Sequence, residues 1–216
     1  MFMPSESSFA AARNLLPVTL SGLPFASGMV AGSLVETPQG WTRVEDLRAG
    51  ARVMTYDGGA QRVAAIRRGS PDREIWAGPG AGLVRVPGGA LDNCNDLMLL
   101  PEQPVLIHAQ AAEAVLGAPA VLIRAAALTG FRGIHRILPG ASVALIALEF
   151  ARDEMVFVNS GTLLYCPAQV QDCNVAPAPG TLVDGFFPLL DAGQAQALLD
   201  LIETDALSTA DLARAA

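Results

Sequence analysis

Cysteine and histidine, which supply many of the nucleophiles, proton carriers and metal ligands of proteins, are few in this sequence. It holds 3 cysteines and 2 histidines among its 216 residues. His108 and His135 are too few, and too far from the cysteines, for the tetrahedral sets that bind zinc. We therefore expect no metal and no cofactor. Cys166 and Cys173 could close a small disulfide loop in an oxidising compartment, and would stay free thiols in a reducing one.

Neighbouring carboxylates are the other possible source of acid–base chemistry. Three pairs occur in the sequence, Glu45-Asp46, Asp72/Glu74 and Asp153-Glu154. Adjacent side chains point to opposite faces of a strand, and each pair lies in or near an expected turn. We therefore expect solvated carboxylates instead of a catalytic pair.

The elements that must position any functional group are best defined between residues 28 and 59. Thr37-Pro38-Gln39-Gly40 has Pro and Gly at the second and fourth positions, which a type I turn favours. Trp41–Val44 is typical of the return strand, with Trp41 expected at the rim of the core. Arg52–Tyr56 alternates like a half-buried strand, and the hairpin signal Asp57-Gly58 leads into a further strand over Gln61–Ile66.

This run resembles the opening of a Hint domain, the Hedgehog/intein autoprocessing module, in its bacterial form. A Gly-Ser/Thr step, a Thr-Pro-x-Gly-Trp turn, a Val-Glu-Asp-Leu connection and an Asp-Gly-Gly hairpin match in order from Gly32 to Gly59. The resemblance continues more weakly through Leu83–Leu91, Leu99–Leu106, Val121–Leu128 and Ala144–Pro167, and in all it covers about two thirds of the chain. The resemblance implies an all-β, horseshoe-like fold of short strands and hairpins, in which the Glu45-Asp46-Leu47 motif orients a loop between strands.

The resemblance also implies where catalytic side chains would stand. Hint domains begin with a Cys or Ser whose side chain attacks the preceding carbonyl, and that position falls on Gly28, which has no side-chain nucleophile. A second family element supplies a hydroxyl and an imidazole, which polarise the scissile amide and protonate the leaving nitrogen. Leu100 stands at the hydroxyl position and Gln103 at the histidine, and an amide cannot transfer a proton near neutral pH as imidazole does.

A third family histidine, in a late Asp-Arg-His-Glu run of many relatives, is replaced here by Asp153. The chemically active positions thus depart from the family while the scaffold pattern is intact. We expect a Hint domain that has lost autocatalytic cleavage and serves as an interaction or scaffold module for a protein partner.

Two other functions stay open. An active self-processing domain, carrying out an N–S or N–O acyl shift at a peptide bond, would need a substitute nucleophile, for which Ser27, Ser33 and Cys94 are candidates. Ser33 lies in the Gly-Ser/Thr turn, where we expect a backbone hydrogen bond. Asn159 precedes a serine, as the last Asn of an intein does, but Val158 stands where the assisting histidine would be. A small-molecule binding protein has no sequence signature for or against it.

Composition is typical of a β-rich chain. Hydrophobic residues make up 51% and charged residues 16%, and 21 Gly and 15 Pro separate short segments. We expect an N-terminal extension over 1–24, a Hint-like β domain over 25–168, a linker over 169–187 and a helical tail over 188–216. In the tail, Asp191 and Gln194 resemble a capping box, and an apolar stripe from Leu190 to Ile202 predicts a helix that covers the β domain.

Charge and hydropathy argue against two kinds of partner. The net charge of −7 disfavours nucleic acid, whose binding depends on neutralising phosphates. No segment reaches the ~18 uninterrupted apolar residues of a spanning helix, and the N-terminus lacks the pattern of a signal peptide. We expect a cytoplasmic location, or export by a route that the N-terminus does not encode.

Overall fold

The strands of the protein form two large antiparallel sheets and one small one. The computed structural model describes residues 27–70, 76, 82–140, 142–168, 182–183 and 187–215, with the backbone alone for 182–183 and 206–215. The first sheet has the order β11 (His135–Ile137), β7 (Leu83–Val86), β8 (Leu97–Leu99), β1 (Met29–Val30), β12 (Leu145–Glu149) and β6 (Ala65–Gly69).

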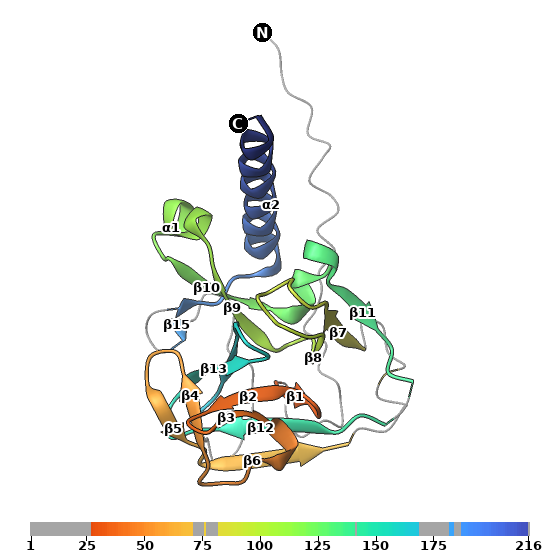
Figure 1. The fold of residues 1–216 in the computed structure, drawn as a ribbon, viewed down its shortest axis with the longest axis vertical. Helices are drawn as coiled ribbons and strands as arrows, with labels where there is room; N and C mark the ends of the chain where they lie inside the picture. Colours follow the sequence, from red (N-terminus) through yellow and green to blue (C-terminus); the bar gives the residue numbers. More distant parts are fainter. Residues whose placement is uncertain are drawn as a thin grey trace.

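The second sheet holds the hairpins that the sequence predicts. Its order is β10 (Ala120–Arg124), β9 (Pro104–His108), β14 (Thr162–Cys166), β13 (Glu154–Val158), β2 (Leu34–Thr37) and β3 (Gly40–Arg43), and β4 (Arg52–Thr55) joins β13 to β5 (Gly59–Arg62). The small sheet pairs β15 (Leu182–Val183) with β16 (Phe187–Pro188). Among the described segments, helical elements form at η1 (Val44–Asp46), α1 (Gln110–Leu116), η3 (Ala125–Leu128), η4 (Phe131–Gly133) and α2 (Ala192–Ala215). The predicted all-β class with a C-terminal helix is confirmed (Figure 1).

The turn predictions hold, whereas one strand is divided. Thr37 pairs with Gly40 across the β2–β3 turn, and the Thr37 hydroxyl donates to the Gly40 carbonyl at 2.7 Å. The Glu45 carboxylate accepts the Gly32 amide at 2.8 Å, so it orients the loop as expected. The predicted strand Gln61–Ile66 is wrong as one element, because β5 and β6 belong to different sheets. Between them, Val63 is buried and pairs with Ala51 and Gly50 through backbone hydrogen bonds, which bend the chain from one sheet to the other.

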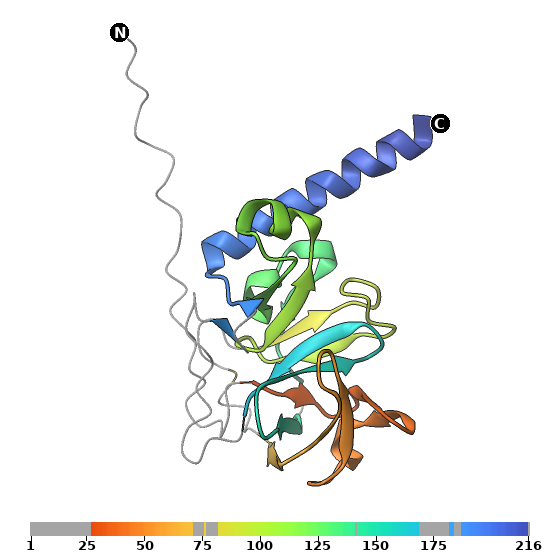
Figure 2. The same ribbon diagram turned by 90° about the vertical axis from the view of Figure 1, so that its left-hand side faces the viewer.

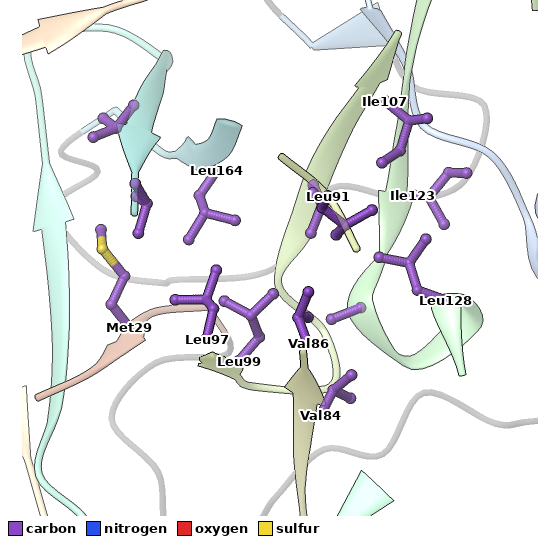
Figure 3. Close-up of a cluster of buried hydrophobic side chains, with 14 of the residues drawn as sticks. Met29, Val84, Val86, Leu91, Leu97, Leu99, Ile107, Ile123, Leu128 and Leu164 are labelled. Carbon is purple, nitrogen blue, oxygen red and sulfur yellow. The ribbon is translucent and has the colours of Figure 1, made fainter. Parts of the chain in front are cut away.

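Alternation along the strands separates three clusters of buried side chains. Val84 and Val86 face a central core between the two sheets, which also receives Leu97, Leu99, Ile107, Ile123 and Leu164 (Figure 3). A second cluster covers the outer face of the second sheet and includes Leu106, Leu122 and Phe187. A third cluster lies on the outer face of the first sheet, where Leu83, Leu100 and Leu145 pack with Trp76. The middle strands of both sheets are therefore buried on two faces, whereas β3 and β5 are largely exposed.

The helix α2 begins with the predicted capping box. The Gln194 amide donates to Asp191 Oδ1 at 2.8 Å, and the Asp191 amide donates to Gln194 Oε1 at 3.1 Å. Leu190, Ala195, Leu198 and Leu199 are buried in the central core, and Ile202 packs against it. The predicted stripe therefore covers the β domain, while the rest of α2 extends away from it (Figures 1 and 2).

The placement expected for Trp41 is wrong. Its side chain is 43% exposed, because β3 pairs only with β2 at the end of the second sheet. The neighbouring Thr42 is the more buried residue of β3.

We expect Trp41→Ala to cost at most about 1 kcal/mol, well below the ~3–5 kcal/mol that a fully buried Trp would lose. Urea unfolding measures this difference directly. A loss above about 3 kcal/mol would contradict the exposed placement.

Several predictions concern residues outside the described part of the chain. These are the N-terminal extension 1–24, most of the linker 169–187, the pair Asp72/Glu74 and any disulfide of Cys173. Cys166 is a buried free thiol, and its burial, with the nearby Glu154 carboxylate, raises the pKa of the thiol. Within the described residues, no helix is both long and apolar enough to cross a membrane.

Candidate functional site

Two of the predicted positions, Gly28 and Leu100, adjoin the ends of neighbouring strands. Met29 of β1 pairs with Leu99 of β8 in an antiparallel register. Gly28 directly precedes β1 and Leu100 directly follows β8, so this register, continued by one residue, brings the two positions opposite each other. Both are buried, so a side chain at residue 28 would stand beside that of residue 100 in the interior.

The Leu100 side chain belongs to the third apolar cluster. It is 1% exposed and lies among Trp76, Leu83, Leu145 and Ala147. A hydroxyl at this position would need a hydrogen-bond partner, because an unpaired polar group in an apolar site costs free energy. The surroundings of residue 100 are therefore those of a core position.

The Gln103 side chain is used to join two strands. It is 2% exposed, and its Nε2 donates to the Pro104 carbonyl at 3.0 Å and to the Tyr165 carbonyl at 2.8 Å. Its backbone amide donates to the Leu100 carbonyl at 3.1 Å, closing the turn between β8 and β9. Both hydrogens of the amide group are thus engaged, and the side chain links the start of β9 to the end of β14.

Asp153 contacts the hydroxyl of Tyr165, the residue whose carbonyl Gln103 binds. Its Oδ1 accepts the Ala168 amide at 2.8 Å. Burial raises the pKa of the Tyr165 hydroxyl, and the charge of Asp153 together with its hydrogen bond to the hydroxyl raises it further. Gln103 holds the Tyr165 carbonyl and Asp153 its hydroxyl, so these two positions are joined through one residue of β14.

Glu102 is an ionisable residue of the turn between β8 and β9, and no motif in the sequence marks it as a site residue. Its side chain is 14% exposed, and its Oε2 lies 3.0 Å from Arg124 Nε. Burial raises the pKa of the Glu102 carboxyl, and the charges of Arg124 and Arg136 oppose that rise. The signal available in sequence was its place between Leu100 and Gln103, next to the position of the family histidine.

The two candidate serines differ in what the structure assigns to them. The Ser33 hydroxyl donates to the Val30 carbonyl at 2.7 Å, so the expected backbone hydrogen bond is confirmed. Ser27 is buried directly before Gly28. The histidines lie on other strands, where His108 ends β9 and His135 begins β11.

Cys94 and Asn159 lie in two loops that contact each other. The Cys94 thiol is exposed and accepts a hydrogen bond from Asn95 at 3.4 Å, and the Cys94 amide donates to the Asn159 carbonyl at 2.8 Å. Asn159 is buried with φ +48°, and its Oδ1 accepts the Leu34 amide at 2.8 Å. The Asn159 amide group thus ties the β13–β14 turn to β2.

Metal ligands do not gather anywhere in the described part of the chain. No group of three or more His, Cys, Asp or Glu side chains there could hold an ion.

Comparison with known families identifies the fold. The family model of the Hint domain matches residues 27–163. The chain belongs to the Hint domain family. The matched range begins one residue before Gly28 and includes Leu100, Gln103, Asp153 and Asn159. No curated protein matches this Hint domain.

Solved structures similar to this Hint domain are inteins and intein-like domains. A bacterial intein-like domain from Clostridium thermocellum is 13% identical, with a TM-score of 0.47 over 64% of this chain and 97% of that one. A splice-inactive variant of the AceL NrdHF class 3 split intein is 10% identical, with a TM-score of 0.45 over 66% and 99% of the two chains. The MchDnaB-1 intein is 16% identical, with a TM-score of 0.38 over 63% and 98%.

Proposed function

We propose that this Hint domain does not cleave itself and serves as an interaction or scaffold module for a protein partner. The observation that carries the proposal is the engagement of Gln103, at the family's histidine position, in two hydrogen bonds between β9 and β14. A general acid must be free to donate a proton to the leaving group. The Gln103 amide has no such proton, and its hydrogens are already bound.

The neighbouring positions support the same conclusion. Gly28 offers no nucleophile for an acyl shift. Leu100 packs in an apolar cluster instead of presenting a hydroxyl to a carbonyl. Glu102 is the ionisable group of the turn, and its ion pair with Arg124 occupies its carboxylate.

We expect the purified protein to keep its full mass during incubation with dithiothreitol or hydroxylamine, which cleave thioesters and esters. Intact-mass spectrometry measures this. Without a nucleophile the acyl shift cannot occur, whereas loss of the general acid alone typically slows such a reaction by about 10²–10⁴-fold.

The single variant Gly28→Cys is the matched control, because it restores the nucleophile while Gln103 remains. It should also stay intact. A wild-type fragment ending at Ser27 or Asn159 would overturn the proposal. If Ser27→Ala, Ser33→Ala or Cys94→Ala then abolished that cleavage, the variant would identify the substitute nucleophile of an active domain.

A further inference from the structure

A pocket beside α2 has features that the cleavage positions do not use. It is lined by Leu91, Asp92, Ile107, His108, Phe131, Arg132 and Ile202, and its volume is about 70 Å³. Its lining residues come from the loop before β8, the end of β9, η4 and α2. None of them is Gly28, Leu100, Gln103 or Asp153.

The buried lining residues, which form the floor of the pocket, have apolar side chains, and the pocket is small. Leu91, Ile107 and Phe131 belong to the central core, and Ile202 packs against that core from α2. An engineered cavity of about 150 Å³ holds benzene, so the ~70 Å³ here suits a short aliphatic group and excludes an indole.

Arg132 provides a fixed positive charge at the rim. It has φ +45° and ψ +37°, a left-handed conformation that non-glycine residues adopt at a cost in free energy. Its Nη1 donates to the Ala90 carbonyl at 3.3 Å, and its guanidinium lies 4.8 Å from the centre of the Phe131 ring. These contacts hold the guanidinium, and they leave its other N–H groups available.

Asp92 provides a negative charge at the same rim. It is exposed and also left-handed, with φ +59°. Its carbonyl accepts the Gly161 amide at 3.1 Å, and a Cβ on Gly161 would lie 2.7 Å from the Asp92 Cβ. The next residue, Asn93, is buried and holds the loop through its side chain. The backbone is therefore rigid where it presents the carboxylate.

The two charges face one pocket without neutralising each other. Among the described residues, no ion pair joins Asp92 to Arg132, and the Asp92 carboxylate has no hydrogen-bond donor. The His108 ring lies against Tyr56, with 5.3 Å between ring centres. Opposite charges held apart over an apolar floor complement a ligand that is itself a zwitterion with an apolar side chain.

We propose that this pocket binds a free aliphatic α-amino acid of the size of valine or leucine. Arg132 would bind the carboxylate of the amino acid and Asp92 would bind its ammonium group. The apolar side chain of the amino acid would lie on the floor of the pocket. Because Ile202 belongs to α2, the bound amino acid would also contact the tail helix. This binding is independent of whether the Hint domain cleaves itself.

Titration of the 15N-labelled protein with L-leucine tests the proposal by NMR. We expect saturable chemical-shift changes at the pocket residues, with a Kd of about 1 mM, because so small a ligand makes few contacts. Leucinamide lacks the carboxylate and N-acetyl-leucine lacks the ammonium group. Each should bind at least about 10-fold more weakly, because a charge-assisted hydrogen bond is lost.

Two variants test the assigned charges. Asp92→Asn and Arg132→Asn remove one charge each, and asparagine tolerates the left-handed backbone. Each should weaken leucine binding about 10-fold, whereas Asp57→Asn, in the exposed β4–β5 turn, should leave the Kd unchanged. Equal binding of leucine, leucinamide and N-acetyl-leucine to the wild-type protein would overturn the proposal. So would the absence of saturable shifts up to about 20 mM leucine.

Discussion

The triple change Gly28→Cys, Leu100→Thr and Gln103→His is expected to destabilise the protein by several kcal/mol. Leu100 is 1% exposed in an apolar cluster, so a threonine there leaves unfilled volume and buries a hydroxyl, at about 2–4 kcal/mol. A neutral imidazole has one N–H and cannot serve both carbonyls that Gln103 holds, which costs a further ~1–3 kcal/mol. The total approaches the ~5–15 kcal/mol by which domains are stable.

Urea unfolding of each single variant and of the triple variant measures these losses, and mass spectrometry of the folded fraction follows any cleavage. Leu100→Val is the matched control for Leu100→Thr, because the two side chains have nearly the same shape and differ in the hydroxyl. A triple variant as stable as the wild type to within about 1 kcal/mol would show that Leu100 and Gln103 are not structural residues. Cleavage by that stable variant would show that these three side chains are sufficient to restore self-cleavage.

Asn93→Ala is expected to destabilise the protein by about 3 kcal/mol or more. The Asn93 side chain is 2% exposed. Its Oδ1 accepts the Leu91 amide at 3.0 Å, and its Nδ2 donates to the carbonyls of Val86, Pro87 and Asn95. Truncation leaves a buried donor and several acceptors without partners, since the methyl group of alanine replaces none of them.

Asn95→Ala is the matched control for Asn93, because the Asn95 side chain is exposed and its amide contacts the Cys94 sulfur. Urea unfolding should show a loss within about 0.5 kcal/mol for this control. Equal effects of the two substitutions would contradict the role assigned to Asn93. Asn93→Ala should also loosen the loop that presents Asp92, so leucine binding should weaken with it.

Local chemistry determined much of the fold in advance. The Thr37–Gly40 turn and the Asp191–Gln194 capping box involve residues three positions apart. Their geometry depends on side chains and backbone preferences that are local in the sequence. The Gly-Ser/Thr step and the Val-Glu-Asp-Leu connection likewise indicated the Hint family, and the same resemblance led to the prediction that Gly28, Leu100 and Gln103 stand at catalytic positions.

Tertiary structure decided what those residues do. Gln103 holds the carbonyl of Tyr165, 62 residues away, and no local pattern predicts that contact. Trp41 shares a strand face with Arg43, so alternation alone left its burial ambiguous, and its exposure depends on which strand lies beside β3. The burial of Glu102 and the pocket between Asp92 and Arg132 arise in the same way. Each depends on segments distant in sequence, and their pairing is settled by the packing of the whole chain around its core.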